Sequence, residues 1–212
     1  MVGGGAVKLT ITGIEEGQPI PSEFAFCIPD PDTHATFAPN RNPALSWDDV
    51  PEGTASLAVL CWDRVVPTSG EDVNQEGREV PADLPRTDFF HWVLVDLDPS
   101  VRVLGEGGFS DGVVPRGKDG PAGPGDTRQG LNDYTGWFTG DPDMEGLYFG
   151  YDGPCPPWND SLIHEYLFTV YALDVATCGV DGDFTGADVR AAIEGHVLGE
   201  ASVMGTYTLN PR

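Results

Sequence analysis

The segment Gly150–Asp174, which reads GYDGPCPPWNDSLIHEYLFTVYALD, limits the possible folds more than any other part of the sequence. Its first half contains Gly153, Pro154, Pro156 and Pro157, and such residues favour a rigid irregular loop over a helix or a strand. Its second half is an unbroken run of aromatic and β-branched residues, which is typical of a buried strand and too short to span a membrane. We therefore expect a stiff loop that leads directly into a buried strand.

The glycine and proline content predicts similar structure for the rest of the chain. The 212 residues include 28 Gly and 19 Pro, about twice the usual usage, which in an ordered protein indicates many turns between short strands. This length suits one hydrophobic core, and no linker divides the apolar residues into two self-sufficient sets. We expect a mainly β fold, with the whole chain, 1–212, as a single domain.

Two interior strands and two long loops can be located from the pattern. Leu57–Trp62 and His91–Leu97 are apolar on both faces, as expected of strands in the middle of a sheet. The loops lie at about 68–90 and 105–147, and both are rich in polar residues. Loops longer than about 15 residues usually serve a function or form a lid. We expect both insertions to shape the rim of a pocket.

The C-terminal region predicts one short helix and a last strand. Thr185 and Asp188 have the spacing of a capping box, and apolar residues then recur at helical spacing up to about residue 198. His196 lies on this apolar stripe, so we expect it to be buried in a structural role. Val203–Leu209 is expected to form the closing strand.

The charge excludes some partners. The chain carries 34 Asp and Glu against 11 Lys and Arg, which gives a net charge of −23. Such a field repels nucleic acids and anionic membrane surfaces. It is typical of proteins from a high-salt cytoplasm, although a simple solubility charge explains it equally well. No apolar leader precedes Lys8 and no segment reaches about 18 apolar residues, so we expect a cytoplasmic protein without membrane insertion and leave a homodimer open.

The cysteines do not predict a metal site. Cys27, Cys61, Cys155 and Cys178 are scattered, and no two of them form a CxxC pair. Zinc-ribbon spacing is therefore absent. Cys61 lies within an apolar strand, where we expect it to be a small core residue.

Several short motifs are similar to those of one family. They are the Gly150–Pro157 loop with His164 and Tyr166, the segments Pro43–Trp47 and Val50–Thr54, His91-Trp92-Val93, and the C-terminal Gly195–Leu198 and Gly205–Tyr207. This set resembles the phosphatidylethanolamine-binding protein family, also called Raf kinase inhibitor-like, in its bacterial and archaeal branch. The resemblance extends from about Leu9 to Tyr207. It implies two packed antiparallel sheets with short peripheral helices.

The resemblance also implies a small anion-accepting pocket without a cofactor or metal. Its expected ligand-binding residues are Asp63, His91, Gly153, Pro154, His164 and Tyr166. Suitable donors would be backbone N–H groups near Gly153, the two imidazolium groups and the Tyr166 hydroxyl. Because an unperturbed histidine titrates near about 6.5, we expect a phosphate or phospholipid head group to bind more tightly as the pH falls from about 8 to about 6.

The segment after Asp63 departs from the family motif. Arg64 and Val65 stand where the family has Pro and Asp, so Arg64 either points to solvent or adds a cation near the ligand. The family's matching bond implies a cis Val66–Pro67 peptide. Glu165 stands between His164 and Tyr166, where the family usually has Arg. Because side chains alternate along a strand, Glu165 should point to the face opposite to these two residues.

Other functions remain open. Relatives in the family inhibit kinases or proteases or act as signalling scaffolds, so an interaction protein is the main alternative to ligand binding. Two His and an Asp are also zinc or iron ligand types and half of a hydrolytic triad. However, the HExxH spacing and the nucleophile elbow of known enzymes are absent from the sequence. We therefore expect no catalysis, and no specific role for His34.

Overall fold

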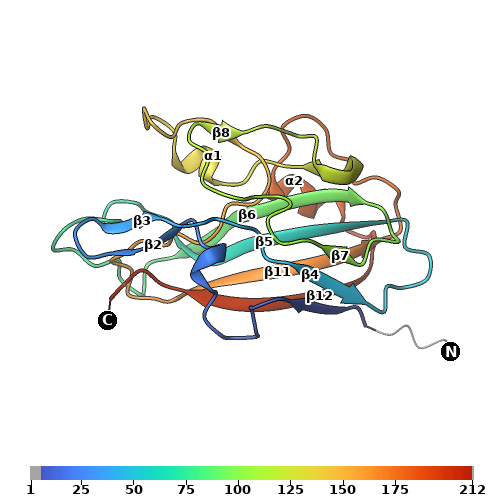
Figure 1. Cartoon of the computed structure of the whole chain (residues 1–212), viewed down its shortest axis with the longest axis horizontal. Coiled ribbons are helices and arrows are strands. Elements are labelled where there is room, and N and C mark those ends of the chain that lie inside the picture. The colour runs from blue at the N-terminus through green and yellow to red at the C-terminus, as the bar shows by residue number, and fades with distance from the viewer. Residues whose placement is uncertain (1–5, 212) are drawn as a thin grey trace.

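The computed structural model describes residues 6–211, and its centre is a five-stranded antiparallel sheet (Figure 1). The strand order is β12-β11-β5-β6-β9. Their bounds are β5 Ser56–Pro67, β6 Arg86–Leu97, β9 Arg128–Gln129, β11 His164–Leu173 and β12 Val197–Tyr207. The strand expected after the Gly-Pro loop is β11, in the middle of this sheet.

Smaller elements cover the central sheet. A three-stranded sheet has the order β1-β4-β7, a hairpin pairs β2 with β3, and β8 pairs with β10. The helices α1 and α2 and two 3-10 turns, η1 and η2, are short. Their bounds are β1 Lys8–Ile11, β2 Cys27–Asp30, β3 His34–Phe37, β4 Leu45–Asp48, β7 Val103–Leu104, β8 Gly117–Lys118, β10 Leu147–Tyr148, α1 Tyr134–Trp137, α2 Gly186–Ala192, η1 Ser22–Phe24 and η2 Pro124–Asp126. Within residues 6–211, no helix is both long and apolar enough to cross a membrane.

Both faces of the central sheet are buried, which explains the apolar runs. Val59 and Cys61 of β5 join the larger core with Trp47 of the three-stranded sheet, whereas Ala58 and Leu60 join a second core that α2 covers. Successive side chains of a strand point to opposite faces, so a strand between two cores must be apolar throughout. The predicted mainly β fold of packed antiparallel sheets with short peripheral helices is confirmed, and Cys61 is a buried core residue as expected.

The C-terminal helix is shorter than predicted. The capping box is present, since the Thr185 side chain accepts the Asp188 N–H and the Asp188 carboxylate accepts the Thr185 N–H. The helix ends at Ala192, because Gly195 has a positive φ of 81° that breaks the helical path. The closing strand therefore begins at Val197, before the expected start.

His196 is not buried, contrary to the prediction. It follows the helix instead of lying on its apolar stripe, and 45% of its side chain is exposed. Its Nδ1 lies 2.8 Å from Oδ1 of Asp174 at the surface. The helical spacing of apolar residues continues past Gly195, although the helix itself ends before this glycine. This continued spacing led to the wrong prediction that His196 is buried.

The expected cis Val66–Pro67 peptide is also wrong. The cis bond among the described residues is Gly120–Pro121. β5 does not turn sharply after Asp63 but continues to Pro67, with Val66 paired to Thr87 of β6 beyond a register shift. A trans bond is what a continuing strand requires.

Candidate functional site

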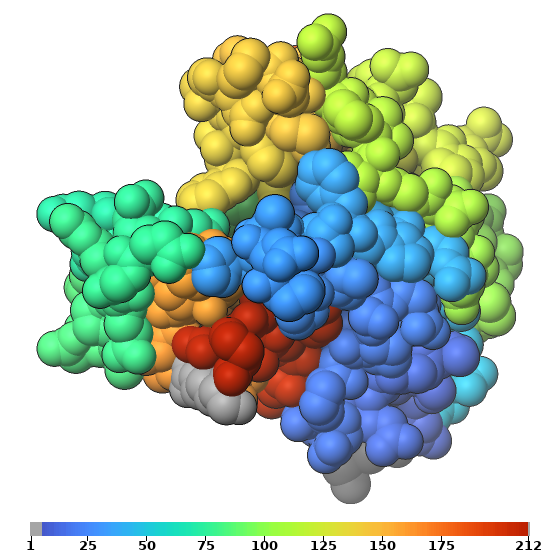
Figure 2. Space-filling view, turned by 60° about the vertical axis from the view of Figure 1, so that its left-hand side comes forward, coloured from blue at the N-terminus to red at the C-terminus, as the bar shows by residue number. Residues whose placement is uncertain are grey.

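A cavity of about 250 Å³ opens at the end of the central sheet where β5 ends and where β6 and β11 begin. This volume is just below the range of about 300–1,000 Å³ that drug-sized ligands occupy, so the cavity suits a small molecule. Figure 2 shows the hollow between the first insertion, in teal, and the last part of the second insertion, in gold, with the β2–β3 hairpin in blue beside it. Both insertions contribute lining residues, as expected.

Sheet register brings four of the predicted residues to the floor of this cavity. Tyr166 of β11 pairs with Asp63 of β5, and Asp63 pairs with Phe89, two residues before His91 of β6. His164 lies two residues before Tyr166 and so leaves the same face of β11. Asp63, His91, His164 and Tyr166 all line the cavity, and each is at most 3% exposed.

Strand alternation turns Glu165 away from the cavity, as expected. Its carboxylate accepts a hydrogen bond from Nε of Arg64 at 2.5 Å, and the two side chains form an ion pair. Arg64 is half exposed and does not line the cavity. The alternative in which Arg64 adds a cation near a ligand is therefore wrong.

His164 is the charged centre of the floor. Its Nδ1 lies 2.5 Å from Oδ2 of Asp63, and its Nε2 lies 3.0 Å from Oδ2 of Asp160. Burial of the ring opposes protonation, but the hydrogen bonds and negative charges of the two carboxylates outweigh it and raise the pKa of His164 to about 9. The ring is an imidazolium at neutral pH. Both of its N–H groups are already donated, so it has none left for an anion, which corrects the expected role of His164.

Asp160 and Arg86 complete a buried row of alternating charges that the sequence did not reveal. Arg86 contacts both carboxylate oxygens of Asp160, at 2.6 and 3.1 Å. Burial opposes ionisation of Asp160, yet the hydrogen bonds from His164 and Arg86 prevail and lower its pKa to about 2. The row Arg86, Asp160, His164, Asp63 carries no net charge. Asp160 lies in an irregular loop, where a separation of four residues from His164 does not predict a contact.

His91 has the opposite character, because it is held neutral. Its Nδ1 lies 2.7 Å from the carbonyl oxygen of Asp152, so Nδ1 carries a proton and donates it. Burial lowers the pKa of His91 despite the nearby charge of Asp63. Because Nδ1 holds the single N–H proton of the neutral ring, Nε2 carries a lone pair. The structure gives Nε2 no hydrogen-bond partner within residues 6–211. The cavity therefore gains an acceptor near neutral pH.

Tyr166 supplies the complementary donor. Its hydroxyl is buried and makes no hydrogen bond of good geometry within residues 6–211, although it lies close to the Asp63 carboxylate. Burial, and secondly the charge of Asp63, raise the pKa of Tyr166 well above its usual value, so the phenol stays protonated. The ring packs edge-on against His91, with centroids 5.1 Å apart. An unsatisfied buried hydroxyl costs about 1–3 kcal/mol, which a ligand or water in the cavity would recover.

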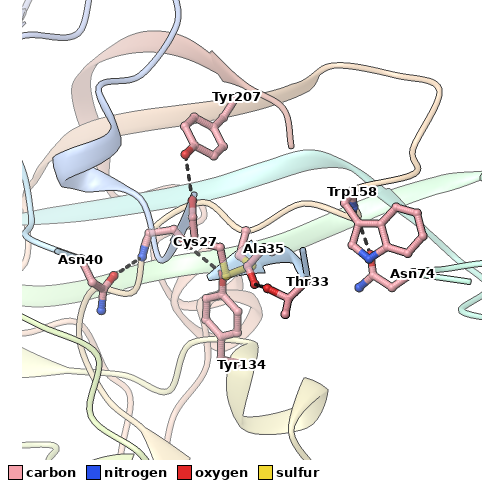
Figure 3. Close-up of a disulfide and its surroundings, with 10 residues drawn as sticks. Cys27, Thr33, Ala35, Asn40, Asn74, Tyr134, Trp158 and Tyr207 are labelled. Atoms are coloured by element: carbon pink, nitrogen blue, oxygen red, sulfur yellow. Dashed lines mark hydrogen bonds between the residues drawn. A yellow bond between two sulfur atoms is a disulfide. The ribbon is translucent and has the colours of Figure 1, made fainter. Parts of the chain in front are cut away.

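The Gly-Pro loop supports the cavity from behind. The Gly153 N–H donates to Oδ1 of Asn40 at 2.8 Å, and the Gly153 carbonyl accepts the Tyr134 hydroxyl at 2.7 Å (Figure 3). A Cβ at position 153 would lie 2.0 Å from the Phe24 carbonyl oxygen, so only glycine fits. Neither Gly153 nor Pro154 lines the cavity. Their expected contact with a ligand is replaced by a structural role.

A disulfide between Cys27 and Cys155 forms part of the cavity wall (Figure 3). It joins β2 to the Gly-Pro loop across 128 positions of sequence. The Tyr207 hydroxyl also holds this wall by donating to the Cys27 carbonyl at 2.8 Å. This disulfide could not be predicted from the sequence, because cysteine spacing does not identify pairs so far apart.

Comparisons with known proteins agree with the fold and with the motifs that build the site. The sequence profile described as "Phosphatidylethanolamine-binding protein" matches residues 10–208. The chain is 30% identical to the UPF0098 protein YbhB of Escherichia coli over 95% of this chain and 100% of that protein. It is 33% identical to a UPF0098 protein of Methanothermobacter thermautotrophicus over 84% and 89% of the two chains.

Solved structures give the same result. The crystal structure of E. coli YbcL, described as a new member of the mammalian PEBP family, superimposes with a TM-score of 0.69 at 25% identity, covering 96% of this chain and 99% of that one. A putative phosphatidylethanolamine-binding protein homologue, CT736 of Chlamydia trachomatis, gives a TM-score of 0.62 at 28% identity over 95% and 97%. The chain belongs to the phosphatidylethanolamine-binding protein family.

Proposed function

We propose that this protein binds a small anionic group, such as a phosphate or the phosphate of a lipid head group, on the floor of the cavity. The observation that carries the proposal is the buried Tyr166 hydroxyl, which makes no hydrogen bond of good geometry among the described residues and whose ring lies beside His91. The family's name supports the same ligand class. Tyr166 donates to an oxygen of the anion, and His91 contacts a second oxygen through Nε2.

The charge balance makes this binding weak. The row of Arg86, Asp160, His164 and Asp63 sums to zero, and the whole chain carries −23. An anion therefore gains little from long-range attraction and is held mainly by hydrogen bonds. Such a site suits reversible binding.

The protonation state of His91 selects the anion. Near neutral pH its Nε2 accepts a hydrogen bond, so an anion that carries its own O–H fits this position better than one that does not. Phosphate carries an O–H in this range, whereas sulfate does not. Below about pH 6.5, protonation of His91 turns Nε2 into a donor, and both anions then bind more tightly. The pH dependence lies below about 6.5 instead of between 8 and 6, since His164 keeps its proton up to about pH 9.

Titration calorimetry with phosphate and sulfate at pH 7.5 and 5.5 tests the proposal. Tyr166→Phe should weaken phosphate binding about fivefold, the effect of one hydrogen bond worth about 1 kcal/mol. Tyr171→Phe is the matched control, because it makes the same change on the opposite face of β11, in the second core. Equal phosphate affinity in the wild type and Tyr166→Phe would contradict the proposal.

Binding without catalysis is part of the proposal. A general base needs a free nitrogen or oxygen within reach of the substrate proton. Both nitrogens of His164 contact carboxylates, and although His91 keeps a free Nε2, the lining residues include no serine or threonine hydroxyl that it could activate as a nucleophile. Incubation with 4-nitrophenyl phosphate should therefore release no nitrophenol above the buffer rate.

The disulfide is evidence about the cellular compartment in which the protein resides. Disulfides persist mainly in oxidising compartments, so the wall formed by Cys27 and Cys155 favours such a compartment over the cytoplasm that the sequence analysis expected. Trapping free thiols with iodoacetamide as cells are lysed tests this. Recovery of Cys27 and Cys155 in alkylated form would restore the cytoplasmic location.

A further inference from the structure

The mouth of the cavity has an unusual composition. Of all aromatic side chains in the described part of the chain, only Phe37 and Trp137 are exposed, at 54% and 51%. Both line the cavity. Phe37 ends β3 and Trp137 ends α1, so they reach the opening from separate elements. Large apolar side chains that stay exposed around a pocket are typical of a binding surface.

A continuous series of ring contacts joins this mouth to the floor. Tyr166 contacts His91, with ring centroids 5.1 Å apart, and His91 contacts Tyr134 at 5.5 Å. Tyr134 stacks on Phe26 at 4.6 Å, and Phe26 meets Phe37 edge-on at 5.5 Å. Aromatic pairs at these separations attract one another beyond simple burial. A molecule that enters the cavity therefore passes along aromatic rings from Phe37 down to the anion-binding hydroxyl.

The two insertions that contribute to the cavity also carry exposed acids. The first insertion carries the exposed acids Glu71 and Glu76, of which Glu76 pairs with His34, and the second carries the exposed Asp143 after α1. A negatively charged extension of a ligand would meet repulsion there, and so would an anionic membrane surface. An uncharged ring meets no such repulsion and fits the exposed faces of Phe37 and Trp137.

We propose that the ligand is an aryl ester of the anionic group, whose uncharged ring lies between Phe37 and Trp137 while its anionic end reaches Tyr166. This rests on the proposed function, because it assigns the remainder of the same ligand. The small size of the cavity, about 250 Å³, agrees with one ring and one head group. The ring would replace water on side chains that are half exposed in the free protein.

Calorimetry with inorganic phosphate, glycerol 3-phosphate and phenyl phosphate at pH 6 tests the assignment. Phenyl phosphate should bind at least tenfold more tightly than inorganic phosphate, a difference of about 1.4 kcal/mol. Glycerol 3-phosphate, with a polar extension, should show no such gain. Trp137→Ala and Phe37→Ala should each reduce the phenyl phosphate advantage at least threefold and leave inorganic phosphate binding unchanged, whereas Trp137→Phe should keep most of the advantage.

The control variant is Leu147→Ala. Leu147 is 48% exposed and belongs to the same insertion as Trp137, but it does not line the cavity, so its loss should change neither affinity. Equal affinity of the wild type for phenyl phosphate and inorganic phosphate overturns this inference and leaves the proposed function intact. Failure of both ligands to bind overturns the proposed function itself.

Discussion

The charged state of His164 gives the sharpest test of the floor. We expect Asp160→Asn to change how stability depends on pH, because it removes one of the two carboxylates that keep this ring protonated. In the wild type the pKa of His164 rises from 6.5 in the unfolded chain to about 9 in the folded protein. At about 1.4 kcal/mol per pH unit, this difference corresponds to about 3 kcal/mol.

The sign of the effect follows from the raised pKa. The folded state binds the His164 proton more tightly than the unfolded state, so this contribution is fully present below about pH 6.5 and is lost as the pH rises through about 9. Without Asp160 the pKa should fall, and the loss between pH 6.5 and 9 should shrink by about half. Asp160→Asn should also lower stability at every pH by about 3 kcal/mol or more, because Arg86 is left buried without its carboxylate.

Urea denaturation at pH 6, 7, 8 and 9, at constant ionic strength, measures the pH slope, and NMR titration of the His164 ring measures its pKa directly. Other groups that titrate at alkaline pH contribute equally to the variant and the wild type. Their contribution therefore cancels when the two slopes of stability against pH are subtracted. Asp174→Asn is the matched control, because its partner His196 is exposed and the pair should contribute little. A His164 ring that titrates near 6.5 in the wild type, or an unchanged slope in Asp160→Asn, would show that the two carboxylates do not keep His164 protonated.

Three further predictions concern stability. Replacing Cys27 and Cys155 by Ala should lower the free energy of unfolding by up to about 5 kcal/mol, since the disulfide closes a loop across 128 positions; an unchanged urea midpoint would exclude this contribution. Gly153→Ala should cost several kcal/mol in the same assay, because its Cβ would lie 2.0 Å from the Phe24 carbonyl oxygen, and an unperturbed variant would mean that this loop can move. The melting temperature should rise with KCl into the multimolar range because of the charge of −23, whereas a flat or falling profile would remove the high-salt interpretation.

Local pattern was enough to predict the interior strands, and the family resemblance supplied the four residues that meet on the floor. Leu57–Trp62 had to be an interior strand because it is apolar on both faces, and it lies between two cores. His164 and Tyr166 are two apart on one strand, so they share a face wherever that strand pairs. Both features depend on residues that are close together in sequence or on the alternation of side chains along a strand. The order of residue types is therefore enough to predict them.

The contacts that decide the roles of these residues are non-local and could not be predicted. Arg86 meets Asp160 across 74 positions and holds the carboxylate that takes one N–H of His164, whereas Asp63 takes the other N–H across 101 positions. The Gly153 N–H meets Asn40 across 113 positions, which removes a donor that the loop sequence seemed to offer. A residue type shows which hydrogen bonds a side chain can make, whereas only the packed structure shows which of them are already made.

A crystal structure of the protein grown with saturating inorganic phosphate would show whether the anion binds on the floor of the cavity. The account predicts one phosphate in the cavity, with the Tyr166 hydroxyl and Nε2 of His91 each about 2.6–3.2 Å from a phosphate oxygen. It also predicts that His164 keeps its contacts with Asp63 and Asp160. A cavity without phosphate, or a phosphate bound directly by His164 in place of those carboxylates, would contradict it.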